Sequence, residues 1–250
     1  MPKSKSISIE VFRAIDDVAL CQEFMRGHRK VLDSYKVPKI TSDNNAWSQN
    51  KDVYVLVVKM KGHGVVGGAR IHVKNESYLL PIEQAFSEKH KDFKEWMVQF
   101  DTLRIGEMCG LWNAKVIAHS GVSLLLTRSI MAKSGIVIAN QLKLNVLLSL
   151  CAPWTVNLVK EFGFSVATQI GNEGSYPYPK PDLPATVMYI KDTDELHSAS
   201  LDQRSKVLDL RYVPVQKKME ERNELQLEVH YNLLIPNLDS SFNDFKEKKP

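Results

Sequence analysis

Cysteines, histidine clusters and long apolar runs are scarce in this sequence, and each scarcity excludes a class of protein. The three cysteines (Cys21, Cys109 and Cys151) are odd in number and far apart, which excludes a disulfide framework or a cysteine-based zinc site. The seven histidines show no H-x-x-x-H or similar spacing, so we predict no bound metal. No run reaches the ~18 apolar residues of a membrane span, and the basic N-terminus lacks the apolar core of a signal peptide. We therefore expect a cytoplasmic protein without a membrane span.

A strong excess of charge of one sign is also missing. The net charge is +4 and the pI about 8.8, and no basic block is interleaved with aromatic residues, so we expect no nucleic-acid partner. A mildly basic chain suits an acidic partner or an anionic cofactor instead. With 44% hydrophobic and 25% charged residues, the chain has the composition of a soluble globular protein.

The apolar pattern predicts strands and helices that follow one another along the first 191 residues. Two dense β-branched runs across a Gly-rich turn predict an antiparallel hairpin, and Asp16 is the expected N-cap of the first helix. The expected elements are a strand at 6–14, a helix at 16–35, a polar loop at 36–52, hairpin strands at 53–59 and 65–73, a short helix within 79–100 before Trp96, a strand at 103–115, a helix at 120–140, a strand at 143–150, a helix at 153–162 and a strand at 185–191.

The remainder of the chain, 192–250, changes character. Residues 207–213 and 225–233 both alternate apolar and polar positions, and a charged stretch, 217–224, lies between them. We expect a strand pair with a frayed tail, appended to the domain formed by 1–191 and packed on it.

Three motifs carry a resemblance to a known family. They are Gly64-Val-Val-Gly-Gly-Ala-Arg-Ile71 in the hairpin, Tyr78-Leu-Leu-Pro-Ile-Glu-Gln-Ala-Phe86 after it, and Gly106-Glu-Met-Cys-Gly-Leu111 in the next strand. Together with the element order, they resemble the GCN5-related N-acetyltransferase superfamily over roughly residues 6–191. Within it, the acyl-homoserine-lactone synthases and N-acyl amino acid synthases are most similar. The resemblance implies a mixed α/β (α+β) fold whose central sheet is mainly antiparallel and flanked by helices.

The resemblance also implies an N-acyltransferase. The acyl group would come from a coenzyme A thioester or an acyl carrier protein, and a small amino-acid-like amine would accept it. The family's Ser-Arg is replaced by Cys109-Gly110 in this chain, and the tyrosine that protonates the leaving thiolate in many relatives is replaced by Val159. These departures leave open an alternative, a catalytically inactive relative that binds an acyl thioester or acts as a scaffold.

The break between the strand at 103–115 and the following helix is a candidate anion site. A helix N-terminus exposes unpaired backbone N–H groups and a positive end-charge, and Gly121 lets an anion approach the backbone closely. The resemblance places the coenzyme A pyrophosphate here, at Ser120, Gly121, Val122 and Ser123, with the pantetheine arm along the preceding strand. The alternative is that Ser120-Gly121 is only a turn and cap.

Two charged residues are the candidate catalytic groups. Glu107 could act as general base toward an amine, directly or through water, and the lactone synthases place the matching glutamate in the substrate cleft. Arg70, on the hairpin, could pair with Glu107 or bind a substrate carboxylate. Backbone N–H groups near Leu111 and Trp112 are the expected oxyanion donors, although the Trp112 side chain is expected to pack in the core.

The loop at 36–52 is the expected acceptor side of the site. Trp47 either clamps onto the core or lines a cleft there, and the resemblance suggests substrate-binding roles for Trp47 and Asp43, and for Asp52. The proline-rich run 176–181 is expected to lie over the mouth of the site, where Tyr176 or Tyr178 could replace the missing tyrosine.

Overall fold

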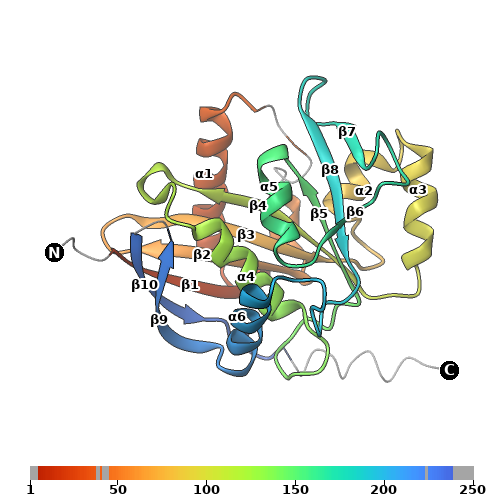
Figure 1. The fold of residues 1–250 in the computed structure, drawn as a ribbon. Coiled ribbons are helices and arrows are strands. Elements are labelled where there is room, and N and C mark those ends of the chain that lie inside the picture. The colour runs from red at the N-terminus through yellow and green to blue at the C-terminus, as the bar shows by residue number, and fades with distance from the viewer. Residues whose placement is uncertain (1–4, 38–39, 41–44, 223–224, 239–250) are drawn as a thin grey trace.

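The computed structural model describes residues 5–37, 40, 45–222 and 225–238 (Figure 1). The strands are β1 (Lys5–Arg13), β2 (Val53–Met60), β3 (Gly64–Val73), β4 (Ile105–Asn113), β5 (Val146–Cys151), β6 (Ser165–Val166), β7 (Ser175–Pro177), β8 (Pro184–Ile190), β9 (Val215–Arg222) and β10 (Leu225–Asn232). The α-helices are α1 (Val18–Ser34), α2 (Pro81–Phe86), α3 (Lys91–Met97), α4 (Val122–Ser134), α5 (Pro153–Lys160) and α6 (Leu201–Tyr212).

A twisted central sheet organises the molecule. Its strand order is β6-β8-β5-β4-β3-β2-β1-β10-β9, with β7 also paired to β8. Two of the neighbouring pairs, β1–β10 and β4–β5, are parallel, and the other described pairs are antiparallel. The expected hairpin of β2 and β3 is confirmed, as is the mixed, mainly antiparallel sheet.

Helices cover both faces of the sheet (Figure 1). Apolar residues of α4, α5 and α6 join one face of the strands in the largest core cluster. The opposite face is covered by α1 with the turn at Asn45–Gln49, and by α2 and α3, through two smaller clusters. Because side chains alternate along a strand, Met108 of β4 faces α4, whereas Glu107 and Cys109 face the side of α1.

Several predicted helix boundaries are wrong by a few residues. The first helix begins at Val18, because Asp17 rather than Asp16 caps it and accepts a hydrogen bond from the Leu20 N–H at 2.8 Å. The helix predicted for 120–140 ends at Ser134, where the chain turns back and the Leu144 N–H donates to the Ser134 carbonyl. Residues 79–100 hold two short α-helices rather than one, and Trp96 lies inside the second.

The C-terminal strand pair exists, but the sequence interpretation misplaced its first strand. Residues 207–213 belong largely to helix α6, capped by Ser200, and the charged stretch forms strand β9. These charges are compatible with a strand because one face of β9 finds partners: Lys218 pairs with Asp209 of α6, and Glu220 pairs with Arg128 of α4. Strand β10 pairs with β1, so the extension continues the main sheet. The expected frayed tail lies outside the described residues.

No helix within the described residues is long and apolar enough to cross a membrane.

Candidate functional site

The parallel strands β4 and β5 separate part-way along their length. Their pairing runs from Ile105–Val146 to Met108–Ser149 and goes no further. At the same point β4 bulges away from β3, because Arg70 pairs with Cys109 whereas Gly68 pairs with Trp112. Gly110 holds a positive φ of 62° inside this bulge, a conformation that glycine adopts without strain. Gly110 and Leu111 therefore leave the regular ladder where the two strands open.

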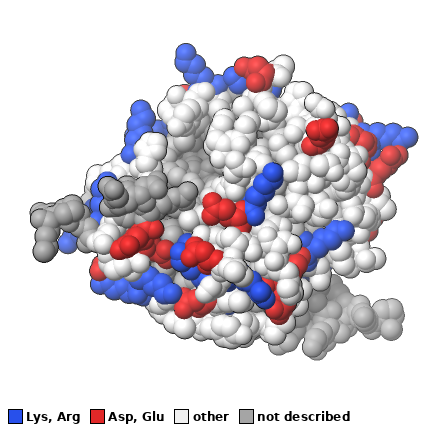
Figure 2. Space-filling view, in the orientation of Figure 1, with Lys and Arg blue, Asp and Glu red and all other residues white. Residues whose placement is uncertain are grey.

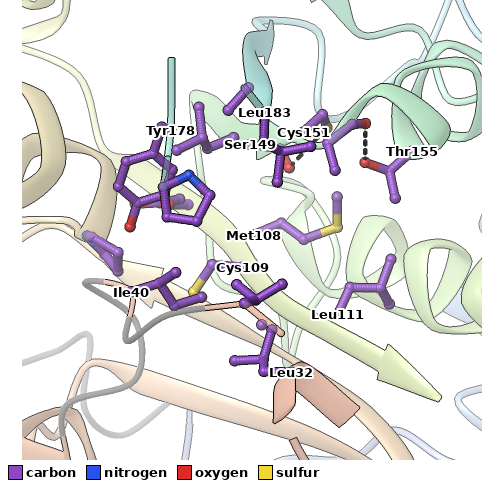
Figure 3. A pocket seen from close by; sticks show the side chains of 18 of the residues that line it. Leu32, Ile40, Met108, Cys109, Leu111, Ser149, Cys151, Thr155, Tyr178 and Leu183 are labelled. Atoms are coloured by element: carbon purple, nitrogen blue, oxygen red, sulfur yellow. Dashed lines mark hydrogen bonds between the residues drawn. The ribbon is translucent and has the colours of Figure 1, made fainter. Parts of the chain in front are cut away.

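A cavity of about 220 Å³ fills the opening (Figure 3). Met108 and Val159 line it from the α4 side of the sheet, and Glu107 and Cys109 line it from the α1 side. The cavity therefore lies where the pairing of β4 and β5 stops. Most of its lining is apolar, and Figure 3 shows Leu32, Ile40, Leu111 and Leu183 around it. On the face of the molecule drawn in Figure 2, basic and acidic side chains are intermingled.

Glu107 lies at the floor of this cavity and is buried, with 2% of its surface exposed. Its Oε2 atom accepts a hydrogen bond from the Ile82 N–H at 2.8 Å, at the start of α2. Burial raises the pKa of the Glu107 carboxyl from 4.5 to about 8, and the Ile82 hydrogen bond and the charge of Arg70 oppose that rise. A carboxyl with a pKa near neutrality can both accept and return a proton under physiological conditions.

Arg70 and Trp47 lie together behind the cavity. Arg70 is 1% exposed, and its Cζ lies 4.1 Å from the centre of the Trp47 ring, a cation–π arrangement. Trp47 is buried against the core, so the clamping interpretation of this residue is the one observed, and neither side chain is among those that line the cavity. A Cβ at Gly110 would lie 3.0 Å from the Arg70 Nε. Arg70 thus occupies the space beside Gly110.

The predicted anion site lies at the N-terminus of α4. Gly121 is the N-cap residue and holds a φ of 80°. The Ser120 hydroxyl donates to the Ile117 carbonyl at 2.6 Å, and the Ser123 hydroxyl accepts from the Asn113 side-chain amide at 2.7 Å. Among the described residues, no acceptor is found for the N–H groups of Gly121, Val122 and Ser123. The first turn of α4 therefore presents free donors beside the end of β4, as an anion site requires.

Comparison with solved structures gives the same architecture. The chain is similar to FeeM, an N-acyl amino acid synthase from uncultured soil microbes, with a TM-score of 0.58, 12% identity, and coverage of 80% of this chain and 99% of the other. The coenzyme A-dependent acyl-homoserine lactone synthase BjaI superposes with a TM-score of 0.51, 12% identity, and coverage of 88% and 97%. The protein ElaA of Escherichia coli gives 0.51 at 11% identity, and coverage of 73% and 98%. The chain has the fold of the GCN5-related N-acetyltransferases. No protein-family model matches the sequence, and no curated protein matches it by sequence.

Within this GCN5-related fold, the remaining predicted site residues are dispersed. The Trp112 ring is buried against Phe24 of α1, with ring centres 5.9 Å apart, and does not line the cavity. Asp43 lies outside the described residues. Asp52 accepts a hydrogen bond from Asn75 at 2.8 Å, a contact within the neighbouring turns. Gly110 and Leu111 line the cavity, whereas Trp112 does not.

The two candidate tyrosines have different surroundings. Tyr176 is buried and donates its hydroxyl hydrogen to Asp92 at 2.8 Å, and burial and Asp92 raise the pKa of the Tyr176 phenol above its ordinary value. Tyr178 lines the cavity, with its ring directed inward (Figure 3). The cavity of the GCN5-related fold thus receives one tyrosine from the proline-rich loop.

The two cysteines at the cavity are unsuited to nucleophilic chemistry at neutral pH. Burial raises the pKa of the Cys109 thiol to about 12 and also raises the pKa of Cys151. The Cys151 sulfur lies 3.4 Å from the Ser149 hydroxyl. Both thiols remain protonated and act as small packing groups. Among the described residues, no three His, Cys, Asp or Glu side chains are grouped as metal ligands.

Sequence reasoning missed most of the cavity lining. The missed residues come from α1, β5, α5 and the loop before β8: His28, Leu32, Ser149, Leu150, Thr155 and Leu183. A glycine inside a strand is a known signal of a bulge, so Gly110 could have located the opening. The other residues converge only through the tertiary fold.

Proposed function

We propose that this protein is an N-acyltransferase that moves an acyl group from a coenzyme A or carrier-protein thioester to the amine of a small amino-acid-like acceptor. The observation that carries the proposal is the cavity through the opened β4–β5 pair. Glu107 lines it from the α1 side of the sheet, and Val159 of α5 lines it from the other side, on which the first turn of α4 presents free N–H groups that can hold a phosphate. In this proposal an extended thioester crosses the sheet at the opening and reaches the Glu107 carboxyl.

The residues around the cavity suit each step of acyl transfer. The acceptor amine attacks the thioester carbonyl, a C–N bond forms, and the carbonyl oxygen gains negative charge, which the backbone N–H of Leu111 in the bulge would stabilise. Glu107 takes the proton that the amine loses. The C–S bond then breaks, and the leaving thiolate gains a proton from the Tyr178 hydroxyl, which recovers it from solvent. Arg70 acts behind Glu107, where its positive charge favours the ionised carboxylate.

The apolar lining favours a donor with a hydrocarbon chain rather than an acetyl group alone, because burying each CH₂ group contributes about 0.8 kcal/mol. The neighbouring structures support the same substrate classes. FeeM is an N-acyl amino acid synthase, and BjaI is a coenzyme A-dependent synthase described with isopentyl-coenzyme A. In this chain, we assign the diphosphate of the donor to the N–H groups of Gly121, Val122 and Ser123.

Calorimetric titration with free coenzyme A and with saturated acyl-coenzyme A of increasing chain length tests the proposal. A matched pair of variants, Gly121→Asp and Gly121→Asn, separates charge from backbone strain. Asp and Asn have similar size and both tolerate the positive φ of 80° found at Gly121, but only Asp places a negative charge beside the proposed phosphate. We expect affinity to increase with chain length, to survive in Gly121→Asn and to fall at least tenfold in Gly121→Asp.

Equal affinity in the two variants would show that the phosphate does not bind at the α4 N-terminus. Absence of binding at every chain length would exclude coenzyme A as donor. Titration with an acylated carrier protein would then test the other thioester, and failure of both would contradict the acyltransferase proposal.

A further inference from the structure

Strand β9 ends the central sheet with an unpaired edge. It is eight residues long and pairs on one side with β10, and no described strand lies on its other side. The opposite end of the sheet is formed by β6 and β7, which are two and three residues long. Long edge strands readily pair with another chain, and natural proteins commonly shorten or cover them. Of the two edges of the described sheet, the β9 edge is therefore the one formed by a long strand.

The charges of β9 are ordered as a self-complementary set. In Lys217-Lys218-Met219-Glu220-Glu221, a two-fold axis through Met219 places Lys217 opposite Glu221 of a second copy, and Lys218 opposite Glu220. Each pairing occurs twice by symmetry. An axis through Lys218 or Glu220 would instead place like charges opposite each other. Opposite charges across an antiparallel pair stabilise it, and like charges destabilise it.

One face of β9 is open to a partner. Val215, Lys217, Met219 and Glu221 alternate along the strand and are all exposed, with Val215 53% and Met219 51% exposed. Lys217 also forms an ion pair with Glu228 of β10 at 2.9 Å, which holds its charge near the edge. In the register centred on Met219, the two methionines would cover each other, and the flanking lysines and glutamates would alternate in sign across the interface.

We propose that two copies of this chain associate through antiparallel pairing of their β9 edges, with the two-fold axis at Met219, so that one continuous sheet crosses the dimer. The interface adjoins a second cavity, of about 230 Å³, which Ser120 and Gly121 line together with Glu220 and Glu221. The partner's lysines would thus lie beside the acidic residues of this cavity. The dimer does not depend on the proposed acyltransferase activity.

Sedimentation equilibrium of the full chain tests the dimer, with Lys217→Glu, Glu221→Lys and the double variant carrying both changes. The wild type is expected at twice the chain mass of 28.4 kDa. Each single variant places like charges opposite each other twice, and we expect at least a tenfold weaker association. The double variant exchanges the two charges and restores both attractive pairs. An equimolar mixture of the two single variants is expected to form a heterodimer.

These positions are chosen because both residues are exposed and alternate with Lys218 and Glu220, which form the ion pairs with α6 and α4, and circular dichroism melting checks that the variants fold. Glu220 is left unchanged because it holds the buried Arg128. A monomeric wild type at all micromolar concentrations would overturn the proposal. Single variants that dimerise like the wild type, or a double variant that stays monomeric, would overturn the register.

Discussion

Glu107 allows the electrostatics of the site to be tested without knowing the acceptor. Glu107 is 2% exposed, and its carboxyl accepts a hydrogen bond from the Ile82 N–H. Glu107→Gln removes the titratable group and keeps an oxygen that can accept the same hydrogen bond. The variant should therefore fold like the wild type while losing the pH dependence that Glu107 contributes.

The sign and size of this contribution follow from the pKa of Glu107. Burial raises it from 4.5 to about 8, so the folded protein holds a proton that the unfolded chain has lost between these two pH values. The stabilisation is fully present below about pH 4.5 and is lost as the pH rises through about 8. A difference of about 3.5 pH units corresponds to about 5 kcal/mol at 1.36 kcal/mol per unit.

Urea unfolding followed by tryptophan fluorescence, at a series of pH values from acid to alkaline, measures the effect. The free energy of unfolding of Glu107→Gln minus that of the wild type should rise by several kcal/mol over this range. Other ionisable groups are common to both proteins and cancel. Glu95→Gln, at a position on α3 where the glutamate is exposed and 3.4 Å from Lys91, is the matched control and should shift by less than about 0.5 kcal/mol. A difference that stays constant with pH would refute the assigned burial of Glu107.

Two further predictions concern packing and a buried ion pair. A Cβ at Gly27 would lie 2.1 Å from the Trp112 ring, so Gly27→Ala should lower the free energy of unfolding, measured by urea titration, by about 1–3 kcal/mol. The same substitution in a Trp112→Leu background should cost less, and an equal loss in both backgrounds would contradict the contact. The Arg128 side chain is 2% exposed and binds Glu220 at 2.8 Å, so Arg128→Met should lower the free energy of unfolding by about 3–5 kcal/mol. Adding Glu220→Gln should recover part of this stability, and no recovery would mean that the unpaired Glu220 carboxylate does not cause the loss.

Local patterns in the sequence were sufficient for much of the fold. The β2–β3 hairpin was predictable because β-branched runs and a Gly-rich turn lie within a few residues of one another. Strand β9 was missed because its charges fit a strand only when Asp209 and Arg128 are already in place. Helix α6 was missed because apolar and polar residues alternate over a short run at its C-terminal end, which resembles a strand. The helix becomes recognisable only when Val207 and Leu210 are buried against the rest of the core.

The candidate site was only partly predictable. Glu107 and Gly121 could be selected because a carboxylate in an apolar run and a glycine before a helix each have a local signature. The opening of β4 from β5 depends on the bulge at Gly110, which is a property of the register between β3 and β4. The position of Arg70 against Trp47 likewise depends on α1 and the turn at Asn45–Gln49, which the strand sequence does not encode.

The central claim, that a thioester donor extends through the cavity between β4 and β5, can be tested by photolabelling. An acyl-coenzyme A with a diazirine in its chain is irradiated with the protein, and the labelled peptides are mapped by mass spectrometry, with and without excess unlabelled acyl-coenzyme A. We predict labels at residues 108–111 of β4 and at residues 151–155, from the end of β5 into α5. Excess unlabelled acyl-coenzyme A should suppress both labels. Labels confined to other segments, or labels that excess acyl-coenzyme A does not suppress, would contradict the account.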